Sequence, residues 1–221
     1  MVKRSLSITI ATLLFLAAPL VQAHEARVEE VINNPTVTCE KAFSIDVTLE
    51  IWNRILDNPC LMGRLWEMYS FQPSYKVTRV DTDIHVSDPS GITGDIRQVG
   101  QSDHARTFFG TGWFDHWAVP SSFTANGVVI FEYNTDRNGL SGEVKILIRG
   151  NNGISRFAIR IFSGILTLRI DNRFKNNLED MKKIIRDIAN DPNKVREALT
   201  GQLLSDFNKV FPEMEINLAE E

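Results

Sequence analysis

The densest group of residues with chemical potential is the run Gly-Thr-Gly-Trp-Phe-Asp-His-Trp at residues 110–117. A histidine beside a carboxylate can act as a general base, because the carboxylate orients the ring while the neutral ring nitrogen accepts a proton. Asp115 and His116 are neighbours in sequence, however, and neighbouring side chains of a strand point to opposite faces. Two interpretations stay open. Either Trp113, His116 and Trp117 line the mouth of a cavity, or they end a strand whose aromatic residues fill the core and whose histidine is solvated.

Other familiar catalytic patterns do not occur in the sequence. No serine lies in a Gly-x-Ser-x-Gly turn, and no glycine-rich loop leads into a helix as phosphate binding requires. The histidines are far apart, and a newly formed N-terminal His24 on its own makes a poor copper site. Tyr133 is the remaining candidate for moving a proton. We therefore expect no metal and no cofactor, and the residue pattern does not specify an enzyme.

The composition is that of an ordinary globular chain with an acidic balance. Of the 221 residues, 43% are hydrophobic and 24% are charged, as in folded domains and unlike disordered chains. The formal net charge is -4 and the sequence pI is about 5.6. Because binding to a phosphate backbone needs an excess of Lys and Arg, we expect no nucleic-acid partner.

The first 23 residues are typical of a cleavable signal peptide. Lys3 and Arg4 form a basic start, and the apolar stretch over residues 8–18 that follows is too short to span a membrane as a helix. Cleavage before His24 would leave 198 residues with a net charge of -6, because the removed segment carries two basic residues and no acidic one. We expect an exported protein, either periplasmic or secreted.

Export affects how the two cysteines are interpreted. Cys39 and Cys60 would lie in a compartment where disulfides persist, so a bridge between them is chemically permitted. Their spacing matches no zinc site. The alternative is two separate buried thiols, since free cysteine packs as a small hydrophobic residue.

The elements that must position these residues begin with a strand. β-Branched residues in loose alternation predict a strand over 36–46, and Asp46 offers a cap for a helix after it. Apolar residues at helical spacing then predict two short helices, the first ending at Pro59 and the second before Pro73. Alternating apolar and polar residues next predict an antiparallel meander with one dry and one wet face. These strands span residues 76–80, 83–86, 92–99, 106–115, 128–133 and 142–149.

The last third of the chain is helical in pattern. Residues 174–188 carry a regular apolar stripe, as expected of a helix that packs on the sheet. Residues 157–170 are apolar over more than half of a helical wheel, and their mean direction differs from that of the later stripe. We therefore predict a bend or break near Asp171 and Asn172. A further helix is predicted over residues 195–210.

The apolar segment 157–170 must be covered on two sides. It is either buried between the sheet and the tail helix, or it contacts something apolar outside the protein. The apolar residues are interrupted by three arginines, Arg156, Arg160 and Arg169. Arginine side chains can extend to a lipid surface. The sequence therefore leaves open a transient membrane contact.

The stretch Phe43-Ser-Ile-Asp-Val-Thr-Leu-Glu-Ile-Trp-Asn-Arg-Ile-Leu-Asp57 and the helix over 61–66 carry a family resemblance. They are similar to a strand end, helix start and second helix of the START/Bet v 1-like (SRPBCC) superfamily, in its polyketide cyclase/dehydrase and lipid-transport branch. The resemblance implies an α+β helix-grip fold. In that fold a curved antiparallel β-sheet wraps around a long C-terminal α-helix, two short helices follow the first strand, and a cavity encloses lipids, sterols or polyketides.

The resemblance covers about residues 36–190, and we expect four parts in the chain as a whole. A signal peptide (1–23) and an N-terminal extension (24–35) precede the START-like ligand-binding domain (36–190), and an added C-terminal helix and tail (191–221) follow it. The signal peptide, the segment 157–170 and the tail depart from the family pattern. A hydrophobic small molecule or lipid is the expected partner.

Three functions fit this organisation. The first is a carrier that encloses a lipid-like ligand, the second a cyclase or isomerase that uses the same cavity, and the third an interaction protein that docks through residues 157–170. The expected lining residues are Trp66, Ile96, Phe131, Tyr133, Val144, Ile146, Ile148, Phe162, Ile165 and Leu166, with Trp113, His116 and Trp117 at the entrance.

Overall fold

The computed structural model describes residues 25–89, 91–114, 123–137, 139–161 and 163–212. The expected signal peptide, the pair Asp115 and His116, Trp117 and Phe162 lie outside this described part, as do the side chains of Ile165 and Leu166.

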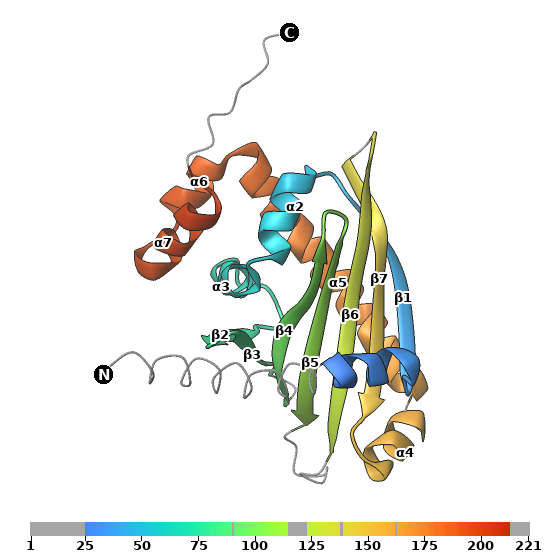
Figure 1. The fold of residues 1–221 in the computed structure, drawn as a ribbon. Coiled ribbons are helices and arrows are strands. Elements are labelled where there is room, and N and C mark those ends of the chain that lie inside the picture. The colour runs from blue at the N-terminus through green and yellow to red at the C-terminus, as the bar shows by residue number, and fades with distance from the viewer. Residues whose placement is uncertain (1–24, 90, 115–122, 138, 162, 213–221) are drawn as a thin grey trace, which may run out of the picture.

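The centre of the molecule is one seven-stranded antiparallel sheet (Figure 1), in the order β1-β7-β6-β5-β4-β3-β2. Strands β2 to β7 follow one another as a meander, and β1 closes the sheet by pairing with β7. The strands are β1 (Val37–Ile45), β2 (Lys76–Val80), β3 (Asp83–Ser87), β4 (Ile92–Ser102), β5 (Ala105–Phe114), β6 (Thr124–Asp136) and β7 (Gly139–Gly150).

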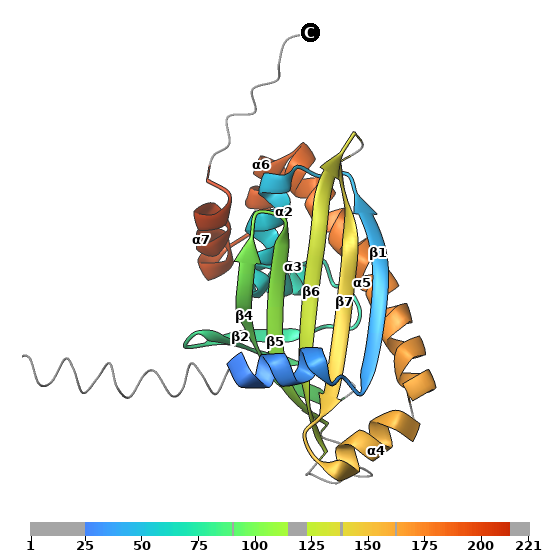
Figure 2. The same ribbon diagram turned by 45° about the vertical axis from the view of Figure 1, so that its right-hand side comes forward.

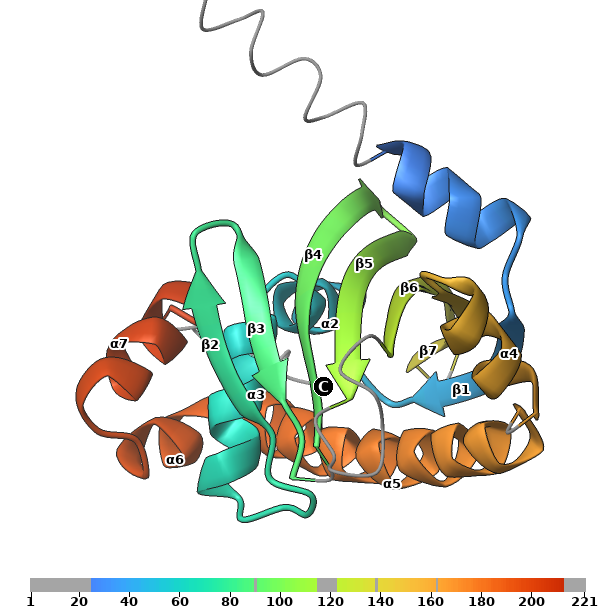
Figure 3. The ribbon, with the colours of Figure 1, turned by 90° about the horizontal axis from the view of Figure 1, so that it is seen from below.

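A long helix lies along the concave face of this sheet. Figure 3 shows α5 (Ser163–Asn190) running the length of the molecule beneath the strands, with α2 (Leu49–Leu56) and α3 (Pro59–Met68) at one end. The remaining helices are α4 (Gly153–Ile161), α6 (Pro192–Glu197) and α7 (Gly201–Val210). This is the α+β helix-grip arrangement predicted from the sequence.

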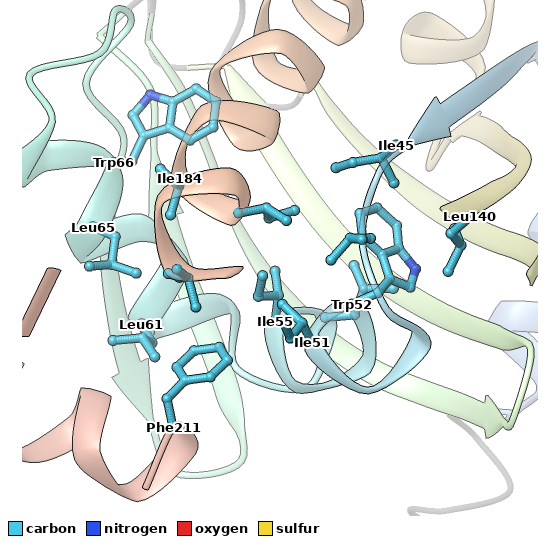
Figure 4. Packing of buried hydrophobic residues seen from close by; sticks show 14 of the residues in the cluster. Ile45, Ile51, Trp52, Ile55, Leu61, Leu65, Trp66, Leu140, Ile184 and Phe211 are labelled. Carbon is cyan, nitrogen blue, oxygen red and sulfur yellow. The ribbon is translucent and has the colours of Figure 1, made fainter. Parts of the chain in front are cut away.

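The main core forms where α2, α3, α5 and the tail meet the sheet (Figure 4). Ile184, Ile185 and Ile188 of α5 are fully buried in one cluster with Leu65 of α3. Phe207 of α7 is fully buried in the same cluster, so the tail belongs to the core and is not a loose appendage. Burial of this apolar area is the main force that holds the helices against the sheet.

Helix α2 begins at a different cap from the predicted one. Asp46 is not the cap, because the chain stays extended up to Thr48, whose hydroxyl accepts a hydrogen bond from the Ile51 amide at 3.4 Å. The shift lets Val47 reach the core before the helix starts.

The break predicted near Asp171 and Asn172 is not present, because both residues lie within one helix. Helix α4 ends at Ile161, and helix α5 spans Ser163–Asn190 and continues through Asp171 and Asn172. The direction of the apolar residues changes because the neighbours change. The first turns of α5 lie beside β1, where Asp171 forms an ion pair with Lys41 at 2.9 Å, whereas the later turns face the sheet centre and α3.

The single tail helix predicted over 195–210 is two helices. Asp191 caps α6 by accepting a hydrogen bond from the Lys194 amide at 2.9 Å. Gly201, the first residue of α7, has φ +58, a left-handed conformation that glycine adopts without strain, so the chain changes direction between the two helices.

The alternation of apolar and polar residues predicts a sheet with one solvent-exposed face. The convex face is in fact partly covered. Residues 25–33 form a helix that crosses this face over β5, β6 and β7 (Figure 2). Its Val31 is fully buried against Phe109, Val128 and Leu147, which all point outward from the grip. Both faces of the sheet are therefore partly covered.

Candidate ligand cavity

A cavity of about 300 Å³ lies between the concave face of the sheet, α3, the β2–β3 hairpin and the middle of α5. Its walls are almost entirely apolar and rich in aromatic rings. They are formed by Phe43, Trp52, Gly63, Trp66, Tyr75, Val77, Val86, Phe131, Val144, Phe174, Asn177, Leu178 and Met181.

Helix α3 forms one wall because it can approach β2 very closely. At Gly63 a Cβ atom would lie 2.4 Å from Cγ2 of Val77, so only glycine permits this spacing. On the same helix the ring of Trp66 packs edge-on against Tyr75, with centroids 5.9 Å apart. The hairpin therefore sits close enough to the helix to close this side of the cavity.

Polar groups gather at one end of the cavity. The Tyr75 hydroxyl accepts hydrogen bonds from the Asn177 amide at 3.0 Å and from the Arg173 guanidinium at 3.2 Å. Arg173 also forms an ion pair with the buried carboxylate of Asp88, and this hydrogen bond raises the pKa of Arg173. Since Asp88 balances the charge of Arg173, the polar end of the cavity carries no net charge.

The structure brings three of the predicted lining residues together. Trp66, Phe131 and Val144 all line the cavity. Ile146 and Ile148 lie on the same face of the sheet, nearer α4, where both pack against the cluster that holds Ile159. They belong to the concave surface and not to the walls of this cavity.

Ile96 also lies outside the cavity wall, half-buried where β4 pairs with Ile84 of β3 and Gly110 of β5.

Trp113 lies on the opposite side of the sheet from the cavity. Phe109, four residues earlier on β5, packs under the helix of residues 25–33, and residues four apart on a strand share a face. Trp113 instead stands beside His85, with ring centroids 6.0 Å apart, and His85 contacts Asp95 at 2.8 Å. The predicted place of Trp113 at a cavity entrance therefore does not fit this cavity.

Tyr133 is a structural residue of the core. Its hydroxyl donates a 2.6 Å hydrogen bond to Asn53 of α2, and its ring packs against Trp52. Burial raises the pKa of Tyr133, whereas a proton carrier needs a pKa near the working pH. Tyr133 does not border the cavity, and its hydrogen bond to Asn53 joins β6 to α2.

Sequence reasoning missed most of the helical wall. Phe174, Leu178 and Met181 line the cavity, whereas their apolar stripe predicts only a helix that covers the sheet. Their spacing shows that they face inward but not whether atoms or space lie opposite them. Phe43 and Trp52 carried a similar signal, since each lies on an inward-facing position of a strand or helix.

The two cysteines are free thiols in the structure. Cys39 lies on β1 and packs against Ile159 of α4, whereas Cys60 lies on α3. The bridge that the sequence permitted is not formed, and the alternative of two separate thiols describes the structure.

Two further properties concern the described part of the chain only. Within it, no three His, Cys, Asp or Glu side chains cluster in a way that could hold a metal ion. None of its helices is both long and apolar enough to cross a membrane.

Tyr69 gives the fold a dependence on high pH. Its hydroxyl donates a 2.8 Å hydrogen bond to Asp187, which joins α3 to α5, and burial together with this carboxylate raises the pKa of Tyr69. A raised pKa stabilises the fold below the ordinary tyrosine pKa of about 10, and this stabilisation is lost as the pH rises toward the folded-state value. Urea unfolding of the wild type should therefore show a steeper loss of stability above about pH 10 than Tyr69→Phe shows. Identical slopes for the two proteins would contradict this assignment.

Among comparisons with known proteins, only solved structures show similarity to this chain. No protein-family model matches it, and no curated protein matches it. Among solved structures, a conserved protein from Geobacillus kaustophilus aligns at 12% identity over 69% of this chain and 97% of that chain, with a TM-score of 0.47. The protein MLL2253 from Mesorhizobium loti aligns at 14% identity over 66% and 98%, with a TM-score of 0.42.

The structure of Ara h 8.0201 aligns at 5% identity over 68% of this chain and 98% of that chain, with a TM-score of 0.43. Likenesses at this level transfer no ligand, activity or site to the chain. The class of the protein therefore rests on its own architecture, a helix-grip α+β fold with an apolar cavity under the sheet.

Proposed function

We propose that this protein is an exported binding or carrier protein that encloses one small hydrophobic molecule between its sheet and its long helix. The observation that carries the proposal is the apolar cavity of about 300 Å³ with polar groups at one end. Ligand sites in proteins have this construction, an apolar enclosure with a few polar groups that fix orientation. The resemblance to START/Bet v 1-like carriers supports the same function, and the signal-peptide pattern of residues 1–23 supports export.

The size of the cavity narrows the ligand class. Cavities that hold drug-sized ligands span roughly 300–1,000 Å³, so this one suits a single short chain or a few fused rings and not a lipid with two long chains. Affinity would come from apolar burial, at about 25 cal/mol per Å². Because Asp88 balances Arg173, we expect the polar end of the ligand to be a neutral hydroxyl or carbonyl that meets Tyr75 and Asn177.

Filling the cavity should weaken ligand binding without unfolding the protein. Val86 of β3 lines the cavity, so Val86→Trp places an indole where the ligand would lie. Binding of the neutral fluorescent probe N-phenyl-1-naphthylamine should weaken about tenfold or more, since losing about 60 Å² of apolar contact costs about 1.5 kcal/mol. The matched control is Thr78→Trp, because Thr78 is exposed and points away from the cavity beside Val77.

Thermal unfolding should be similar for both variants and the wild type. Equal probe binding by the wild type and Val86→Trp would overturn the proposal. The ligand itself can be identified by organic extraction of protein purified from its native host, followed by mass spectrometry. It should be present in stoichiometric amount.

A further inference from the structure

Helix α4 exposes an apolar face that no described element covers. It lies outside the grip, beyond the end of β7 and below the sheet (Figure 1). Ile154, Phe157 and Ile161 follow one another at helical spacing and are 65%, 67% and 60% exposed, while Ser155 and Ile159 face inward and are buried. Leu168, early in α5, is 64% exposed.

The tail does not cover this face. Helices α6 and α7 pack with α2 and α3 at the opposite end of the molecule (Figure 1), where Phe207 and Phe211 are buried. The alternative in which residues 157–170 lie between the sheet and the tail helix is therefore wrong for α4. Four of the seven exposed large apolar residues in the described part of the chain belong to α4 and the early turns of α5.

The charge around α4 has one sign. Between Glu143 and Asp171 the sequence has five basic residues and no acidic one, although the chain as a whole is acidic. Lys145 and Arg149 of this stretch are paired with carboxylates on the convex side of the sheet. On α4 the guanidinium of Arg156 bonds the Gly150 carbonyl, and neither Arg156 nor Arg160 forms an ion pair with any residue in the described ranges.

We propose that α4 is an interfacial helix that docks the protein onto an anionic lipid bilayer. Phe157, Ile154 and Ile161 insert at the boundary of head groups and acyl chains, while Arg156 and Arg160 contact lipid phosphates. This pairing of an apolar face with basic flanks is the composition of helices that lie in a membrane surface. The docking surface is separate from the cavity, so the membrane-docking proposal can be tested independently of the proposed carrier function.

A second copy of the chain is a poorer occupant of the same face. A symmetric dimer through α4 would bring Arg156 and Arg160 of both copies close together, and like charges repel. The exposed face of a helix of nine residues is also small beside the roughly 800 Å² that each partner buries in a stable interface.

Vesicle sedimentation tests the proposal with protein produced from His24 onward, which retains every described element. The protein should bind vesicles of phosphatidylcholine mixed with phosphatidylglycerol more tightly than vesicles of phosphatidylcholine alone, and salt should weaken this binding. Phe157→Asp should reduce affinity about tenfold or more, because a large apolar side chain no longer enters the bilayer. Arg160→Gln should reduce it about fivefold.

The matched control is Val80→Asp, which changes a 55% exposed apolar residue on β2 and should leave vesicle binding intact. Ile161→Asp provides a second variant of the α4 face if Phe157→Asp proves hard to produce. Absence of binding by the wild type, binding that neither α4 variant weakens, or salt-independent binding to neutral vesicles would overturn the proposal. So would a dimer that Phe157→Asp dissociates.

Discussion

Replacing Asp57 with alanine should lower the free energy of unfolding by about 3 kcal/mol. Asp57 caps the end of α2 and holds Arg106 of β5 through two hydrogen bonds, Nε to Oδ1 at 2.6 Å and Nη2 to Oδ2 at 3.1 Å. The Arg106 side chain is only 3% exposed, and its hydrogen bond to Asp57 raises its pKa. Removing the carboxylate leaves a buried guanidinium with no counter-charge, which is the costly way to break a buried pair.

Two further variants separate the buried charge from ordinary surface pairing. Glu50→Ala removes the exposed ion pair with Arg54 on the same helix and should cost about 0.5 kcal/mol or less. Adding Arg106→Met to Asp57→Ala should recover part of the lost stability, because no unpaired charge then remains in the core. Urea unfolding measures all three. If Asp57→Ala lowers the free energy of unfolding no more than Glu50→Ala does, the ion pair between Asp57 and Arg106 is not important for stability.

Replacing Trp52 with alanine should cost about 3–5 kcal/mol. Its side chain is fully buried, and its ring contacts those of Phe43, Phe131 and Tyr133 with centroids 5.3, 6.4 and 5.9 Å away. The buried indole Nε1 has no hydrogen-bond partner among the described residues, so the loss comes from packing and not from a broken hydrogen bond.

Trp52 also lines the cavity, which gives its removal a second consequence. The deletion enlarges the apolar space, so a small apolar molecule such as indole should bind there and restore part of the stability by mass action. Chemical unfolding with and without indole measures both effects. Trp113→Ala is the control, because Trp113 is half-buried on the convex face. Equal losses at the two tryptophans, or no stabilisation of Trp52→Ala by indole, would contradict this account.

Local sequence determined the order of the elements and many of their bounds. Strand β1 was predicted over 36–46 and spans Val37–Ile45, and β2 has its predicted bounds. Alternation and turn residues act within a few positions of each other, so they survive in any tertiary context. Strand β6 is longer than its predicted 128–133, because residues such as Gly127 carry no apolar signal and join the strand only by pairing with both neighbours.

The faces of the elements depended on partners distant in sequence. Alternation along β5 predicts that Phe109 and its sequence neighbours lie on opposite faces of the sheet. It does not predict which of the two faces is concave. The helix of residues 25–33 decides that Phe109 is buried on the convex side, and Trp113 goes with it. In the same way, the apolar face of α5 changes direction near Asp171 because the neighbour of the helix changes there from β1 to the sheet centre and α3, and the helix itself continues.

The sequence by itself determined the order of strands and helices, an acidic chain, and an apolar excess around residues 157–170, and its resemblance to the START/Bet v 1-like superfamily implied the helix-grip fold. Only the tertiary structure decided where that excess is exposed and where a cavity remains. The cavity walls come from β1, α2, α3, the β2–β3 hairpin, the sheet centre and α5, and no local pattern reports a space between segments that lie far apart in the chain. Exposure of Phe157 and Ile161 likewise depends on α6 and α7 packing at the other end of the molecule, since a helix face is covered only where another element reaches it.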